Sequence, residues 1–116
     1  MKKLILVVEN DKRTRDVLRK LFETKNINTI SIDSSNKVMD LLKTVEPDCI
    51  LAGNYFPNSM SGIELGLNLK ETGIPFVLFS GSRDTVKKAR DGGITCFKKP
   101  YVKSLVHFIN DLLKEG

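Results

Sequence analysis

A regular alternation of short apolar runs with longer amphipathic stretches constrains the fold of this chain more than any other feature. The apolar runs predict five β-strands, at residues 3–8, 28–32, 49–52, 76–79 and 95–98. Helical spacing predicts five helices, at about 12–25, from a cap at 34–36 to Pro47, at 62–72, 83–91 and 102–115. Strands that alternate with helices in this way indicate a parallel sheet covered by helices on both faces.

Right-handed crossovers between five such strands favour a doubly wound α/β fold of the flavodoxin type, with strand order 2-1-3-4-5. In this fold, ligands bind beyond the carboxyl ends of the strands, at the switch point between the first and third strands. The residues at the strand ends should therefore surround one shallow pocket. They are Glu9, Asn10, Gly53, Asn54, Ser80 and Lys99.

The length and composition indicate one globular domain that spans residues 1–116. Hydrophobic residues make up 41% of the chain and charged residues 28%, which argues against disorder. No apolar run approaches the roughly 20 residues needed to span a bilayer. The apolar segment after Lys3 is too short for a signal peptide. We therefore expect a cytoplasmic protein without a membrane partner.

The chain is basic, with 19 lysines and arginines against 14 aspartates and glutamates, and a formal net charge of +5. Such a charge can indicate a nucleic-acid or acidic protein partner. Here the basic residues are scattered along the sequence, and a pattern of exposed aromatic residues interleaved with them is not evident. Solvated helix faces explain the charge better, so direct nucleic-acid binding is not expected.

The two cysteines, Cys49 and Cys96, lie in apolar runs and lack the CxxC spacing of redox and zinc sites. Buried free thiols are the simplest interpretation of both. The chain contains a single histidine, His107, so a zinc site is not expected.

Four short motifs follow one another in a fixed order along the predicted strands and helices. They are Glu9-Asn10-Asp11 after the first strand, residues 47–51 (PDCIL), residues 57–65, and the pair Ser80-Gly81 with Lys99-Pro100-Tyr101. On these motifs the chain resembles the receiver domain of bacterial response regulators (the CheY-like family), over essentially all of its residues. The resemblance implies two-component signalling as the function.

The resemblance also implies a phosphorylation pocket. In receivers, an aspartate at the end of the third strand attacks a phosphoryl group as nucleophile. That aspartate and an acidic residue after the first strand together hold a magnesium ion, which prefers hard carboxylate oxygens. A serine or threonine hydroxyl and a lysine bind the phosphoryl oxygens. Glu9, Ser80 and Lys99 match these supporting positions in this sequence.

The acceptor position departs from the family pattern. Counting from Pro47 places it on Gly53, whereas counting back from Ser61-Gly62 places it on Asn54. We favour Gly53, because the loop at residues 57–60 carries one extra residue. Neither alternative offers a carboxylate, so the chain resembles an atypical receiver that lacks the phosphoacceptor aspartate.

The acidic pair is reduced as well, since Asn10 stands where receivers usually have an aspartate. Glu9 and Asp11 are the weak candidates for metal ligands, and Asp11 qualifies only if the turn is shifted by one residue. We expect a Glu9–Lys99 ion pair, weak or absent magnesium binding, and no aspartyl phosphate. Receivers often carry an aromatic residue on the fifth strand, three positions before the lysine, and the rotamer of that ring is coupled to the hydroxyl of the fourth strand. At this switch position the chain has Cys96, and Phe97 should face the other side of the sheet.

Three functions remain as hypotheses. The first is a non-enzymatic signalling module (a pseudo-receiver) that binds a histidine kinase, another regulator or an output protein. Its surface would be the fourth helix, fifth strand and fifth helix, at residues 83–114. The second is a working phosphoacceptor that uses an unexpected residue, such as Asp11 or Ser80. The third is a small-ligand site, ranked last because no glycine-rich phosphate loop follows the first strand.

Overall fold

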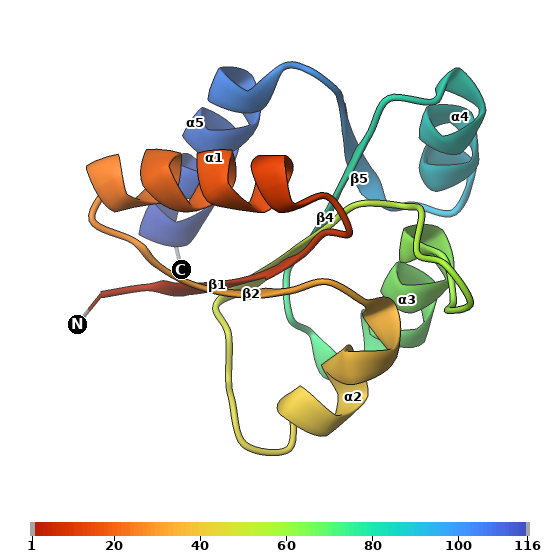
Figure 1. The fold of residues 1–116 in the computed structure, drawn as a ribbon, viewed down its shortest axis with the longest axis horizontal. Helices are drawn as coiled ribbons and strands as arrows, with labels where there is room; N and C mark the ends of the chain where they lie inside the picture. Colours follow the sequence, from red (N-terminus) through yellow and green to blue (C-terminus); the bar gives the residue numbers. More distant parts are fainter. Residues whose placement is uncertain (1, 116) are drawn as a thin grey trace.

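Five parallel strands form one sheet with helices on both faces, as the computed structural model of residues 2–115 shows (Figure 1). The strand order is β2-β1-β3-β4-β5, as predicted. The strands are β1 (Leu4–Val8), β2 (Asn28–Ile32), β3 (Cys49–Ala52), β4 (Phe76–Ser80) and β5 (Thr95–Lys98). The helices are α1 (Lys12–Thr24), α2 (Val38–Leu41), α3 (Gly62–Asn68), α4 (Arg83–Asp91) and α5 (Val102–Glu115).

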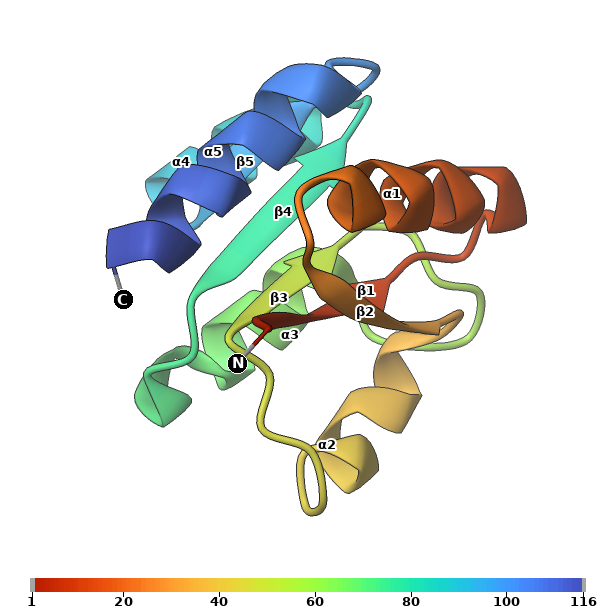
Figure 2. The same cartoon turned by 90° about the vertical axis from the view of Figure 1, so that its left-hand side faces the viewer.

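Alternation along the central strands explains why two layers of helices form. In β1, Ile5 and Val7 point into the core under α1 and α5, whereas Leu6 and Val8 point into the core under α2 and α3. All four side chains are fully buried. Because successive side chains of a strand face opposite sides, a continuous apolar run needs cover on both faces. Figure 2 shows α1 and α5 lying beside each other on one of these faces.

The helices differ from the predicted ones in length and in the face that they bury. The second helix is a 3₁₀ turn (Ser35–Lys37) followed by the single turn of α2, and the third ends in a 3₁₀ turn (Lys70–Thr72). Apolar spacing places both members of the pairs Val17-Leu18 and Phe108-Ile109 on the inner faces of α1 and α5, but only Leu18 and Ile109 are buried. Val17 is 46% exposed and Phe108 is 37% exposed, because the buried stripe runs one residue further around each helix. In the described residues, no helix is long and apolar enough to cross a bilayer.

The two cysteines differ in environment. Cys49 is fully buried in β3, whereas Cys96 in β5 is only half-buried, which corrects the expectation that both are buried. Burial, and to a lesser extent the charge of Asp48, raises the pKa of the Cys49 thiol to about 12. Burial also raises the pKa of Cys96.

We therefore expect Ellman's reagent at pH 8 to modify Cys96 in the native protein and to leave Cys49 untouched until unfolding. At that pH the thiolate fraction of Cys49 is on the order of 10⁻⁴, and only the thiolate reacts. Because the pKa of this thiol in the unfolded chain lies near its ordinary value of 9.0, stability should be unaffected below pH 9 and fall between pH 9 and 12. A Cys96→Ser variant is the control, and rapid native labelling of that variant would contradict the prediction.

Candidate functional site

The carboxyl ends of four strands bring most of the predicted site residues to one edge of the sheet. Backbone hydrogen bonds extend the strand pairing past the last strand residues, from Gly53 N to Val8 O (2.9 Å) and from Lys99 N to Ser80 O (2.9 Å). Glu9 N likewise donates to Ile32 O (3.0 Å). These bonds hold the residues that follow the strands at fixed heights, so the side chains of Glu9 and Lys99 converge.

An ion pair between Glu9 and Lys99 forms the centre of this site. Lys99 Nζ donates to Glu9 Oε1 at 2.9 Å, and Asp11 N donates to Glu9 Oε2 at the same distance. The Glu9 side chain is 8% exposed and that of Lys99 is 34% exposed. The ammonium group also lies 5.6 Å from the centroid of the Phe79 ring. Both carboxylate oxygens of Glu9 are therefore already used by the protein itself.

The carboxylate of Glu9 occupies the space that a side chain at position 53 would enter. A Cβ atom added to Gly53 would lie only 2.8 Å from Glu9 Oε1. Position 53 thus faces the pocket, whereas Asn54 points away from it. Asn54 Oδ1 accepts from Ile63 N at 3.1 Å, and Asn54 Nδ2 donates to Thr85 Oγ1 at 3.3 Å. Of the two alternatives, geometry places Gly53 at the pocket.

Asp11 is directed toward α1. It is the N-cap of that helix, where its carboxylate accepts from Thr14 N (3.1 Å) and Thr14 Oγ1 (2.7 Å). These hydrogen bonds from Thr14 lower the pKa of Asp11. The Asn10 side chain is exposed. Arg15 Nη1 donates to the backbone carbonyl oxygens of Glu9 (2.7 Å) and Asn10 (3.0 Å). Arg15, which fixes this turn, was not identified from the sequence.

The donor set at this edge does not fit a resident magnesium ion. Magnesium requires near-octahedral oxygen coordination. The pocket offers one carboxylate, and both of its oxygens already have partners. Within residues 2–114, no three His, Cys, Asp or Glu side chains are grouped to hold a metal. In the same residues, no buried side-chain nitrogen or oxygen lacks a hydrogen-bond partner.

Ser80 and Cys96 lie at the edge of the pocket and in the sheet beside it. Ser80 is buried, and its Oγ accepts from Ser82 N at 3.3 Å, at the beginning of α4. Cys96 packs on the side of α4, against the cluster of Leu78, Ala89 and Ile94. Phe97 lies on the opposite face, where its ring is 5.0 Å from that of Phe108. The aromatic ring of β5 is therefore on the other side of the sheet from the side chain at the switch position.

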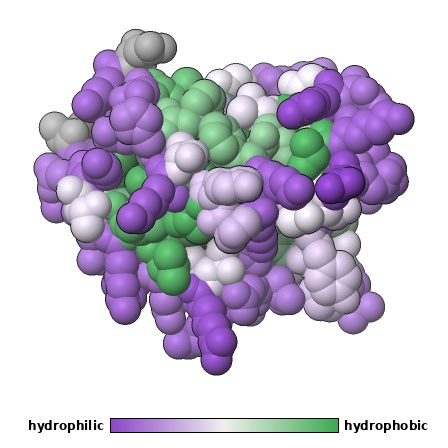
Figure 3. Space-filling model, turned by 90° about the horizontal axis from the view of Figure 1, so that it is seen from above, coloured by the Kyte–Doolittle hydropathy of each residue, from purple (hydrophilic) through white to green (hydrophobic). Residues whose placement is uncertain are grey.

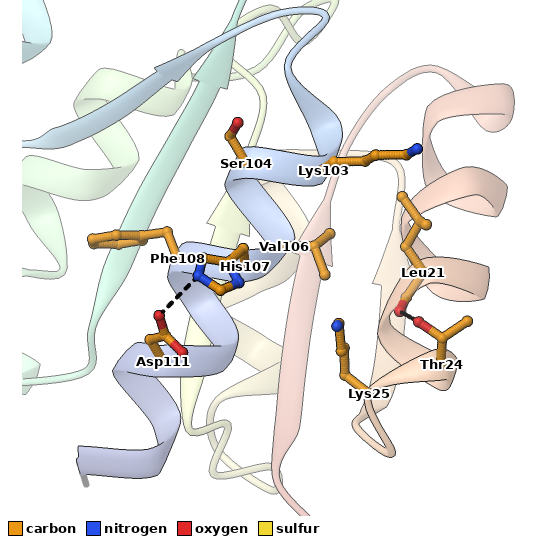
Figure 4. A pocket seen from close by; sticks show the side chains of 9 residues that line it. All are labelled: Leu21, Thr24, Lys25, Lys103, Ser104, Val106, His107, Phe108 and Asp111. Atoms are coloured by element: carbon orange, nitrogen blue, oxygen red, sulfur yellow. Dashed lines mark hydrogen bonds and ion pairs between the residues drawn. The ribbon is translucent and has the colours of Figure 1, made fainter.

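A separate groove of about 660 Å³ runs between α1 and α5, and neither Glu9 nor Lys99 lines it (Figure 4). Leu21 and Val106 form apolar parts of its wall, and His107 lies 3.2 Å from Asp111 at one side. Figure 3 views the side of the molecule on which α1 and α5 lie and shows apolar side chains exposed among hydrophilic ones. Among the described residues, Asp111 is the partner of His107 and no nucleophilic side chain is hydrogen-bonded to this histidine, so this groove does not compete with the strand-end site as a place for chemistry.

Comparison with known proteins gives matches over nearly the whole chain. A family model described as "Response regulator receiver domain" matches residues 5–109. The structure is similar to that of the Francisella response regulator 1452 receiver domain, at 22% identity and a TM-score of 0.85, with 98% of each chain covered.

Two further solved structures are similar. One is a signal receiver domain of a signal transduction histidine kinase from Syntrophus aciditrophicus, at 22% identity and a TM-score of 0.86. The match covers 97% of this chain and 91% of the Syntrophus chain. The other is a CheY-like response regulator receiver domain protein from Methanospirillum hungatei, at 19% identity and a TM-score of 0.85. The match covers 99% of this chain and 96% of the Methanospirillum chain. At these identities the structures establish a shared fold. No curated protein matches the chain.

Proposed function

Because this chain belongs to the family of response regulator receiver domains, we propose that it is a two-component signalling module that works without phosphorylation. One observation carries the proposal: the Glu9 carboxylate fills the space at Gly53 and neutralises Lys99. An acceptor aspartate and its phosphoryl group would need that space and that lysine. The site is closed by the protein's own side chains.

The chemistry at the strand ends supports this proposal. Gly53 has no side chain, and the amide of Asn54 is not a nucleophile of the kind that forms an acyl phosphate. The alternative acceptors are less well placed, since Asp11 caps α1 and the hydroxyl of Ser80 is hydrogen-bonded to Ser82 N. We propose no catalytic residues, and weak or absent magnesium binding.

A protein partner is the remaining way to transmit a signal. We propose the face formed by α4, β5 and α5 (residues 83–114), with a histidine kinase, another regulator or an output protein as its partner in the cytoplasm. Lys87, Lys98 and Lys103 are exposed on these elements, which favours a partner with an acidic surface. Phe108 is the one large apolar side chain of α5 exposed above a third within the described residues, and it would anchor the contact.

We expect an amide NMR titration with magnesium and then acetyl phosphate to leave the resonances of Glu9, Gly53, Ser80 and Lys99 unchanged. Intact mass should show no added phosphoryl group. Saturable shifts at these residues together with a gain of one phosphoryl group would show instead that this is an active receiver. A phosphoryl group that persists on an Asp11→Asn variant would then exclude Asp11 as its site.

The matched test is to return a carboxylate to the pocket. Gly53→Asp alone should bind magnesium poorly, because the new side chain collides with Glu9 Oε1. Shortening the neighbour in a Glu9→Asp/Gly53→Asp double variant should give saturable magnesium-dependent shifts, since two carboxylates can then face one cation. If the single variant already bound magnesium as well as the double variant, Glu9 would not be the group that closes the site.

A further inference from the structure

Four lysines lie around one hollow at the edge of the sheet opposite the Glu9–Lys99 site. The start of β1 and the C-terminal ends of α1 and α5 meet at that edge (Figure 1). A hollow of about 730 Å³ lies between them. Its polar lining among the described residues consists of Lys2, Lys3, Lys25, Lys114, Asn26 and Asn110, and none of these is acidic. The four lysines are among the nineteen lysines and arginines of the chain.

The lysines of the hollow differ from many others in the molecule. Lys12, Lys37 and Lys88 each pair with an aspartate four residues away on the same segment. Within the described residues, none of the four lysines of the hollow has an ion-pair partner. Asp48, the acidic side chain at the start of β3, accepts from Leu4 N at 2.8 Å and does not line the hollow. The four lysines therefore line the hollow without an ion-pair partner among the described residues.

Helix dipoles account for only part of this charge. The C-terminal ends of α1 and α5 each carry roughly half a negative charge, which favours lysines nearby. Together the two helix ends would offset the positive charge of about one of the four lysines. Mutual repulsion of the remaining charges costs free energy unless an anion is bound. A structural role as helix C-terminal cations therefore leaves most of the charge unexplained.

The shape of the hollow restricts what could bind. Asn26 has a positive φ of 60° in a turn held by its N–H to Glu23 O (3.0 Å), so the turn after α1 is fixed. Ile27 and Leu113, which are 5% and 7% exposed, give the lining a small apolar floor. Lysines from three separate segments thus converge on one place of ligand size.

We infer that this hollow is a binding site for a compact polyphosphate anion. Lysine ammonium groups recognise phosphate as point charges, without the planar geometry that arginine imposes. A nucleic acid would need a basic stripe that follows its backbone for several phosphates. The four lysines surround one compact hollow and do not form such a stripe. The apolar floor also suits a nucleoside, so inorganic polyphosphate and the polyphosphate of a nucleotide share the chemistry that this hollow recognises.

The test is an amide NMR titration of the whole chain with inorganic tripolyphosphate at constant ionic strength, without magnesium. We expect saturable shifts at Lys3, Asn26 and Asn110. A Lys25→Gln/Lys114→Gln variant should bind about tenfold more weakly, because each exposed ion pair contributes about 0.7 kcal/mol and 1.4 kcal/mol is tenfold. A Lys87→Gln/Lys98→Gln variant loses the same charge from α4 and β5, and its affinity should change less than about twofold.

A parallel titration with ATP distinguishes the two sources of the anion. Tighter binding than tripolyphosphate, with shifts at Ile27 and Leu113, would identify a nucleoside polyphosphate, and equal affinity would identify the inorganic anion. Three results would overturn the inference. They are no saturable shifts at millimolar tripolyphosphate, equal weakening in the two lysine variants, or tighter binding of a short DNA duplex or an acidic peptide at the same ionic strength.

Discussion

Replacing Gly62 with alanine should destabilise the protein by about 3 kcal/mol, a large effect for the addition of one methyl group. A Cβ atom at this position would collide with the carbonyl oxygen of Gly53 and lie 2.6 Å from Leu78 Cδ1. The backbone cannot retreat easily, because Gly62 N donates to Asn54 O at 2.9 Å. Urea unfolding followed by circular dichroism would measure the loss.

Gly81→Ala is the matched control for this prediction. At Gly81 the added Cβ would meet only Lys99 Cβ, at an ordinary distance of 3.8 Å. Its free energy of unfolding should stay within about 0.5 kcal/mol of that of the parent. Similar losses in both variants would mean that the close approach of α3 to the loop after β3 is not what Gly62 provides.

The second large effect concerns the Glu9–Lys99 ion pair, whose two partners should respond unequally to substitution. Lys99→Met leaves the buried carboxylate of Glu9 with Asp11 N as its remaining partner. We expect a loss of about 2 kcal/mol, below the 3–5 kcal/mol of fully buried pairs, because Lys99 is 34% exposed. Glu9→Gln should cost less, about 1 kcal/mol, since the lysine can turn toward water and the amide keeps an acceptor.

The measurement is chemical unfolding of both single variants and of Glu9→Gln/Lys99→Met. The double variant should be more stable than Lys99→Met alone, because it no longer buries an unpaired charge. A double variant whose losses simply add would argue that the two side chains are not energetically coupled. In that case the ion pair would not be what closes the pocket.

Sequence reasoning worked well for the sheet, because strands buried on both faces leave a strong signal. The bounds of β2, β3, α4 and β5 agree with the predicted residues. The buried faces of α1 and α5 were harder, since Val17-Leu18 and Phe108-Ile109 are adjacent apolar pairs. Either member of such a pair can continue an apolar stripe, and only the position of the neighbouring helix decides which is buried.

The site was predictable as a place but not as a set of contacts. The strand ends identified Glu9, Ser80 and Lys99 as neighbours, because parallel strands end at a common edge. The choice between Gly53 and Asn54 depended on a shift of one residue in a loop, which reverses the direction of a side chain. The cap formed by Asp11 and the guanidinium of Arg15 depend on the geometry of a single turn, which sequence patterns do not specify.

The overlap between the Glu9 carboxylate and the space above Gly53 also bears on how such a chain can evolve. Positions 9 and 53 are not free to change independently, because any side chain at 53 must first displace the carboxylate from 9. An aspartate introduced at 53 would meet a site that is already full, and selection would have little new activity to act on. The carboxylate is the far end of a flexible side chain, so it could move aside only at the expense of its ion pair with Lys99. The effect of a substitution at one of these two positions therefore depends on the residue at the other.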